Sequence, residues 1–220
     1  MKILKEILFS LLAIAIVVLI PQSGILNKII PLPFSYSIVI IVFIWLFLKF
    51  SKENFASLGF SFKRCNLNAV LIGTIAGILL FTFLQYAFFP LLRQIISLAP
   101  ADLGFFNKVR YNTGTYVFTL VMGWIVGGIY EEIVFHGFIF TRLEKLIGGR
   151  YAVLVSFLLT NIIFALYHWQ LGTSGVINAF VAGMVYHALI LRYKRNMWYG
   201  IICHAVFDTI ALTFIYLGYW

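Results

Sequence analysis

The sequence predicts an all-α fold, a polytopic transmembrane helix bundle of about seven (7–8) spans with a polar site inside the bundle. Of its 220 residues 63% are hydrophobic and only 10% are charged, and the mean hydropathy is +1.02. A soluble domain carries roughly 25% charged residues, so lipid must face much of this chain. The apolar residues form runs of about 18–25, the length that crosses a hydrocarbon core of roughly 30 Å. No polar stretch is long enough to fold separately, which predicts a single integral membrane domain over 1–220.

Seven apolar runs give the expected spans in order, at about 6–26, 34–50, 68–92, 115–141, 150–168, 173–192 and 197–217. The first run lacks a small-residue cleavage site and is interpreted as a retained helix and not as a signal peptide. The segment Ser51 to Asn68 is polar with interspersed phenylalanines, which is typical of a segment at the membrane interface. The segment Arg93 to Gly114 is the longest loop expected on the other side.

The distribution of Lys and Arg along the chain indicates how it is oriented in the membrane. Most of the sixteen Lys and Arg residues fall in the segments that this layout places on the side of the N-terminus. The positive-inside rule therefore predicts a cytoplasmic N-terminus and an outer C-terminus. The net charge is +9, but the basic residues flank the apolar runs and form no single stripe. Nucleic acid is therefore not an expected partner. The two cysteines, Cys65 and Cys203, have no zinc or redox spacing, and no bridge between them is expected.

Three of the seven acidic residues, Glu131, Glu132 and Asp208, fall inside predicted spans, and the four histidines lie within or at the ends of apolar runs. An acid near the bilayer centre costs about 2.5–3.5 kcal/mol on insertion scales, so such residues face the bundle interior and have partners. Glu, Asp and His suit proton transfer, water activation or metal binding. A voltage sensor or an anion pore would instead use Arg and Lys.

The adjacent Glu131 and Glu132 cannot share one environment, because neighbouring residues on an α-helix point about 100° apart. Glu132 and His136 are separated by four residues and are predicted to pair. Glu131 is left without an intrahelical partner, and a buried, unpaired carboxylate suits a general base. The alternative is that both acids pair with basic groups on neighbouring helices.

The remaining polar residues of the apolar runs do not indicate a role when each is considered alone. His168 lies at the end of an apolar run, where an interfacial role is common. His204 and Asp208, one turn apart, are either a self-satisfying pair or a donor pair aimed at a substrate carbonyl. His187 has no acid one turn away and is interpreted as a structural polar group. At 1.5 Å per residue, Glu131 lies about 16 Å from the inner boundary at Arg142, and His204 about 13 Å from that at Arg195. Counted from Arg150, His168 lies about 27 Å down, which does not match unless its helix is tilted or begins above the plane of Arg142.

Three motifs occur in order, each on its own predicted helix: Glu131-Glu132 with His136, Phe164 with His168, and His204 with Asp208. Their order and spacing resemble the CAAX prenyl protease and bacteriocin-processing (CPBP, Abi) family of intramembrane proteases. The motif-bearing core covers about 115–215. The family has an Arg at the position of His136, so the change keeps a donor for Glu132 but makes it dependent on pH.

The resemblance implies an intramembrane endopeptidase that hydrolyses a peptide bond near the C-terminus or leader of a peptide or membrane-anchored substrate, including lipidated proteins. In this interpretation Glu131 and His168 activate water, His204 and Asp208 hold the oxyanion, and Glu132 and His136 give structural support. A divalent metal such as zinc is left open, with Glu131, His168 and His204 as its ligands in a metalloprotease. A metal-free glutamate mechanism is slightly preferred.

Two other functions are considered. A diverged, non-catalytic family member would act as a membrane scaffold or a bacteriocin-immunity protein. A proton-coupled transporter would be expected to show internal repeats or broken helices in matching halves, and the sequence shows neither. A retained basic N-terminus and short loops are typical of an integral protein of a prokaryotic plasma membrane.

Overall fold

The computed structural model describes residues 2–30 and 33–219, with side chains from residue 7 onward except that of residue 27, and this part of the chain is helical without a β-strand. The α-helices are α1 (Lys2–Gln22), α2 (Ile25–Ile29), α3 (Ser35–Phe50), α4 (Leu67–Phe83), α5 (Phe89–Ile95), α6 (Thr113–Met122), α7 (Phe140–Ile147), α8 (Ala152–Tyr167), α9 (Gly172–Arg192) and α10 (Trp198–Tyr216). Two π-helices, η3 (Leu84–Phe88) and η5 (Gly123–Ile139), and four 3₁₀ turns, η1 (Phe55–Leu58), η2 (Phe62–Arg64), η4 (Gly104–Phe106) and η6 (Trp169–Leu171), complete the chain.

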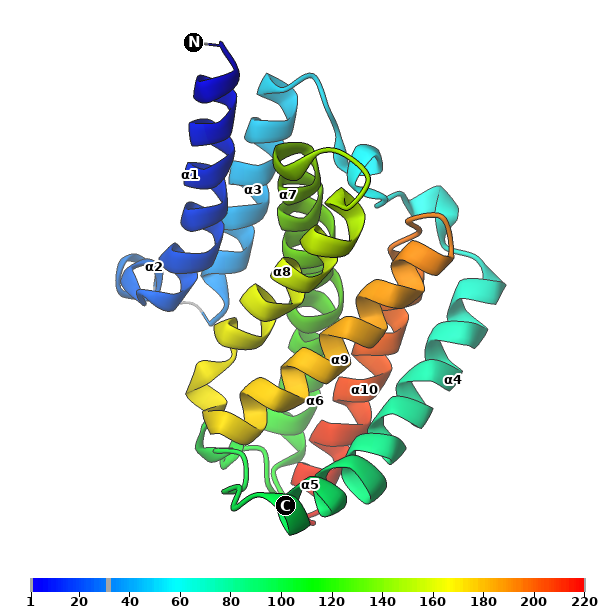
Figure 1. Cartoon of the computed structure of the whole chain (residues 1–220). Coiled ribbons are helices and arrows are strands. Elements are labelled where there is room, and N and C mark those ends of the chain that lie inside the picture. The colour runs from blue at the N-terminus through cyan, green and yellow to red at the C-terminus, as the bar shows by residue number, and fades with distance from the viewer. Residues whose placement is uncertain (1, 31–32, 220) are drawn as a thin grey trace.

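Apolar helices occupy the place of each predicted span. Four helical segments are long and apolar enough to cross a membrane, at Leu67–Ile95, Thr113–Ile147, Trp169–Arg192 and Trp198–Tyr216. Three further apolar helices, Ile7–Gln22, Ser35–Phe50 and Ala152–Tyr167, have 10–17 residues. The segments that the charge count placed together lie at one end of the bundle with the N-terminus, and the C-terminus lies at the other end (Figure 1). We call the first the basic end.

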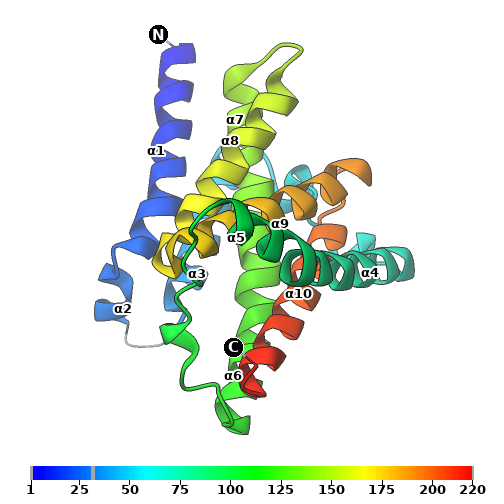
Figure 2. The ribbon, with the colours of Figure 1, turned by 60° about the horizontal axis from the view of Figure 1, so that its bottom comes forward.

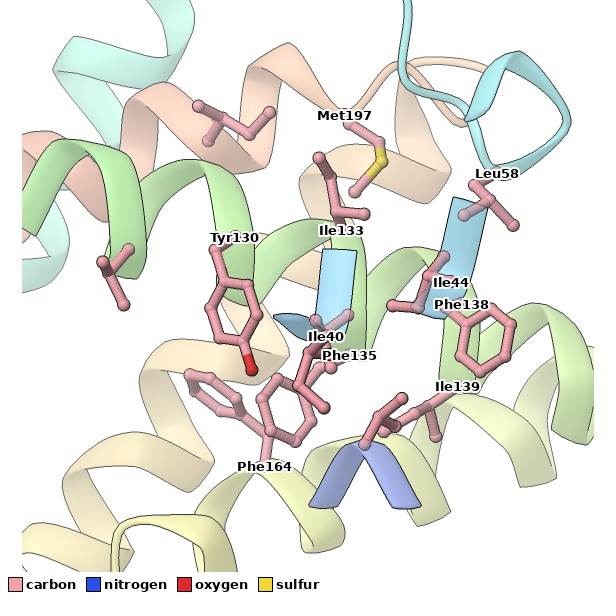
Figure 3. Close-up of a cluster of buried hydrophobic side chains, with 14 of the residues drawn as sticks. Ile40, Ile44, Leu58, Tyr130, Ile133, Phe135, Phe138, Ile139, Phe164 and Met197 are labelled. Carbon is pink, nitrogen blue, oxygen red and sulfur yellow. The ribbon is translucent and has the colours of Figure 1, made fainter. Parts of the chain in front are cut away.

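The fold is organised around the continuous helix formed by α6, η5 and α7. It runs through the middle of the bundle, with α1 to α3 on one side and α4 and α10 on the other (Figures 1 and 2). Within η5 nearly every residue from Val126 onward is buried. An apolar cluster that includes Ile40 and Ile44 of α3 and Phe135 and Phe138 of η5 fills the face toward α1 and α3 (Figure 3). The opposite face of η5 is therefore free to carry polar groups toward α8 and α10.

Helix α10 is fixed by a close approach to α4. A Cβ atom on Gly77 of α4 would lie 2.7 Å from the carbonyl oxygen of Cys203, which is too close for any other residue. Glycine at this position lets the two backbones touch. Since His204 follows Cys203, this contact sets the place of one of the predicted site residues.

Ion pairs tie the basic end together. Glu53, in the segment after α3, accepts hydrogen bonds from Arg142 and Lys145 of α7, each at 2.5 Å. Glu144 of α7 is paired with Arg195 at 2.7 Å. Burial favours the neutral form of the Glu53 carboxyl, but the hydrogen bonds and charges of Arg142 and Lys145 outweigh it and hold the pKa of Glu53 below 4.5. The segment after α3 is thus attached to the helix that carries the acidic motif.

This attachment predicts a pH dependence of thermal stability. Because the folded-state pKa of Glu53 is lowered, its contribution is present above about pH 4.5 and is lost as the pH falls through the folded-state pKa. We expect the variant E53Q to have a lower Tm than the wild type in detergent at pH 7, and the two Tm values to converge as the pH falls through the folded-state pKa of Glu53. A difference in Tm that stayed constant over this range would contradict the assignment. Asp102, an exposed acid that forms no ion pair among the described residues, provides the control D102N.

Candidate active site

The charges of the predicted spans meet where three helices converge. Glu131 and Glu132 come from η5, His168 directly follows α8, and His204 and Asp208 come from α10. Glu132 is fully buried, whereas 29% of the Asp208 side chain and 18% of the His168 side chain are exposed. The group therefore extends from the interior of the bundle to its surface.

The π-helical backbone of η5 differs from the regular α-helix that the sequence predicts. Hydrogen bonds from i to i+5 widen each turn, and such segments are frequent at functional sites. Residues four apart still lie on one side of the wider helix. The predicted separation of the two acids is accordingly retained, because Glu131 and Glu132 have different partners.

Glu131 of η5 faces His168, which directly follows the neighbouring helix α8. The His168 Nε2 atom lies 3.7 Å from Oε2 of Glu131, and the Nδ1 atom donates to the carbonyl oxygen of Phe164 at 2.8 Å. With its proton on Nδ1, the neutral ring presents a lone pair at Nε2 toward Glu131. The separation in depth predicted for an untilted helix is wrong, because α8 runs obliquely across η5 (Figure 1) and brings its last residues to Glu131.

Glu132 links two histidines. Its Oε2 atom is 2.7 Å from Nδ1 of His136, so the pair predicted from the spacing of four residues is present. Its Oε1 atom is 2.9 Å from Nδ1 of His204 on α10. The second contact was not predicted, because it joins residues 72 positions apart in the sequence. Glu132 thus holds the ring of His204 from one side.

Asp208 lies on the other side of the His204 ring, with 3.6 Å between its Oδ2 atom and Nε2 of the histidine. The Tyr186 ring stacks on that of His204 at 4.4 Å between centroids and an angle of 15°. Gly127 of η5 leaves the room that Asp208 occupies, since a Cβ atom there would lie 2.5 Å from Oδ2. The His204 ring is therefore held by two carboxylates at its edges and by an aromatic ring on its face.

Behind Glu132 lies a layer that sequence reasoning missed, centred on Asn161 of α8. The Asn161 amide nitrogen lies 2.7 Å from the carbonyl oxygen of Phe157 and 3.1 Å from Nδ1 of His187. Its Oδ1 atom lies 3.3 Å from Nε2 of His136. The sequence feature that could have identified this layer is Asn161 itself, a polar residue in the middle of an apolar run. His187, interpreted as a structural group, is fully buried, and its ring lies 4.7 Å from that of His136.

This layer fixes the hydrogen bonding of His136. An amide nitrogen only donates, so the contacts of Asn161 turn its oxygen toward His136, and Nε2 of His136 must carry a proton. The Nδ1 atom then shares a second proton with the Glu132 carboxylate. His136 thus offers hydrogen bonds from both ring nitrogens, as a cation at this position would.

The arrangement does not fit the ligand set considered for a metal. Among the residues described, no three His, Cys, Asp or Glu side chains are grouped to hold a metal ion. The Nδ1 atom of His204 is held by Glu132 at 2.9 Å, and its Nε2 atom lies 3.6 Å from Oδ2 of Asp208. We therefore derive no chemical step through a metal.

Comparison with known proteins agrees with the motifs. Residues 113–210 match the family model for type II CAAX prenyl endopeptidase Rce1-like proteins. The match begins at the first residue of α6 and ends within α10, so it covers every residue of the candidate site. No curated protein and no solved structure was found to match the chain. The family match therefore covers the part of the chain that carries the site, residues 113–210, and agrees with the resemblance of its three motifs to the CPBP family.

Proposed function

We propose that the protein is an intramembrane endopeptidase that uses Glu131 and His168 to activate a water molecule. The observation that supports this most directly is the approach of Glu131 Oε2 to His168 Nε2 at 3.7 Å. At this separation the two groups share no direct hydrogen bond, and a water beside them can bond to both. Such a water would donate one hydrogen to each acceptor and turn an oxygen lone pair toward a substrate carbonyl.

The chemical steps follow from general base catalysis. As the water oxygen attacks the carbonyl carbon, its proton passes to the Glu131 carboxylate. The carbonyl π electrons move to oxygen, and a tetrahedral oxyanion forms. When the C–N bond breaks, the protonated Glu131 returns its proton to the departing amine, so the carboxylate is regenerated.

His204 is proposed to stabilise the oxyanion. Its Nδ1 atom is held by Glu132, which favours a second proton at Nε2 and makes this nitrogen a charged donor. Donors placed where negative charge develops give the largest single effect in many hydrolases. Asp208 is placed to orient the ring through Nε2, and in its protonated form it would add a second donor.

We propose a peptide or membrane-anchored substrate, cut near its C-terminus or leader, as in CAAX processing. The partly exposed His168 and Asp208 side chains mark the edge of the site by which such a chain would enter. We also propose that the protein lies in a prokaryotic plasma membrane. Its N-terminus is proposed to be cytoplasmic because the basic end carries most of the Lys and Arg residues.

The test is direct proteolysis by the purified full-length protein in neutral detergent. A prenylated CAAX peptide, the same peptide without the prenyl group and a leader peptide would each be incubated with it, and products identified by mass spectrometry. We expect cleavage of at least one peptide, and the same rate after treatment with a chelator. Loss of activity on chelation and recovery with zinc would contradict the metal-free mechanism.

Gly127 gives a sharper test of Asp208. In the variant G127A the added methyl group would displace the Asp208 carboxylate, which can move because it ends a flexible side chain. We expect the protein to fold, and kcat/KM for peptide cleavage to fall by about 10- to 100-fold. The matched control is G123A, one turn away, where a Cβ atom makes ordinary contacts of 3.5 Å with Leu212 and 3.9 Å with Asp208. Equal activity of the two variants would contradict a role for Asp208.

A further inference from the structure

A shallow pocket of about 440 Å³ lies at the basic end, away from the candidate active site. It is formed where η2 meets the connection between α9 and α10. Its lining combines four cations with amide and phenol groups: Lys63, Arg64, Asn66, Arg192, Tyr193, Lys194, Asn196 and Tyr199. No acidic residue lines it.

The charge of this pocket is not neutralised. In the described part of the chain, Lys63, Arg192 and Lys194 form no ion pair. The nearby acids are used elsewhere at the same end, Glu53 by Arg142 and Lys145, and Glu144 by Arg195. The pocket therefore concentrates positive charge, whereas the surface around α7 is balanced.

The pocket is also rigid. Arg64 donates from its two terminal nitrogens to the carbonyl oxygens of Arg195 at 3.1 Å and Lys194 at 2.7 Å. The buried Asn196 donates back to the carbonyl oxygen of Arg64 at 3.0 Å. These reciprocal bonds join η2 to the connection between α9 and α10. The Arg64 cation, held in place in this way, can bind an anion without a large cost of ordering.

The residues beside the pocket indicate that it faces lipid. Phe62 and Leu67, which lie next to the basic residues of η2 and Asn66 in the chain, are 75% and 73% exposed. Exposed apolar side chains beside Lys and Arg are typical of segments that lie at a membrane surface, with the apolar groups in the lipid and the charges among the headgroups. A soluble anion would not require these apolar neighbours.

We propose that this pocket binds the phosphate-bearing headgroup of an anionic phospholipid in the leaflet that meets the basic end. Lys63, Arg64, Arg192 and Lys194 contact the phosphate, while the Asn66 amide and the Tyr193 and Tyr199 phenols bind the headgroup hydroxyls. Phe62 and Leu67 lie along the acyl chains. This site is independent of peptide hydrolysis and does not rest on the proposed function.

The test uses the full chain in neutral detergent, titrated with mixed micelles that contain either phosphatidylglycerol or phosphatidylcholine. Bound lipid would be counted by native mass spectrometry for the wild type and for the variant K63Q/R192Q/K194Q, which keeps Arg64 and its backbone bonds. A matched control, K49Q/K52Q/R150Q, removes three cations from the same end outside the pocket. The same titration of E131Q separates lipid binding from catalysis.

We expect the affinity for phosphatidylglycerol to fall by about 10- to 100-fold in the pocket variant, because each Lys or Arg contributes to binding at an anionic surface. The affinity should change little in the control variant and in E131Q. Equal loss in the two triple variants would show general attraction to charge and overturn the site. Equal binding of phosphatidylcholine by the wild type would do the same. Complete competition by millimolar inorganic phosphate would identify a site for the free anion and overturn the assignment to a lipid.

Discussion

Replacement of Glu131 by glutamine is expected to lower kcat/KM for peptide cleavage by at least about 100-fold. General base catalysis contributes roughly 10²–10⁴-fold to hydrolysis, and glutamine, which has the same shape, cannot accept the proton of the attacking water. Because His168 lies 3.7 Å from Glu131 and does not share a short hydrogen bond with it, the change breaks no close contact. The fold should therefore persist while activity is lost.

The measurement is the initial rate of cleavage of a peptide that the wild type cuts, with the Tm of each variant measured in the same detergent. The control E144Q changes an acid of α7 that is paired with Arg195 and lies outside the site. We expect E144Q to keep most of the activity and E131Q to keep the wild-type Tm. Activity of E131Q equal to that of the wild type would rule out Glu131 as the base. An unchanged cellular phenotype in that variant would favour a non-catalytic member of the family.

Replacement of His136 by phenylalanine is expected to lower the free energy of unfolding by about 3 kcal/mol. The change leaves the fully buried Glu132 carboxylate without its 2.7 Å partner. Removal of one member of a buried ion pair costs about 3–5 kcal/mol, and the lower value applies because Glu132 keeps His204. Since Glu132 also orients His204, activity should fall with stability.

The matched control is H187F, which changes the neighbouring buried histidine into the same residue. The Nε2 atom of His187 has no hydrogen-bond partner, and Asn161 would keep the carbonyl of Phe157 as an acceptor. We therefore expect H187F to cost less than half as much as H136F when both are measured by denaturation in the same detergent. Equal destabilisation would show that the size and shape of the two rings matter here, and that the partner of Glu132 does not.

The sequence by itself was sufficient for the features that depend on local spacing. Apolar runs predicted where the helices lie, because a chain in lipid must satisfy its backbone hydrogen bonds within each helix. A spacing of four residues predicted the pair of Glu132 and His136, since both side chains belong to one helix. The motifs also predicted the family, and the match over residues 113–210 confirms it.

Only the tertiary structure decided the contacts between helices. The oblique path of α8 brings His168 to Glu131, and the approach of α10 to η5 brings His204 to Glu132. The role of Asn161 beside His136 became visible in the same way. Such contacts depend on the tilt and crossing of helices, which packing around residues such as Gly77 and Gly127 sets, and no count of residues along one helix contains that information.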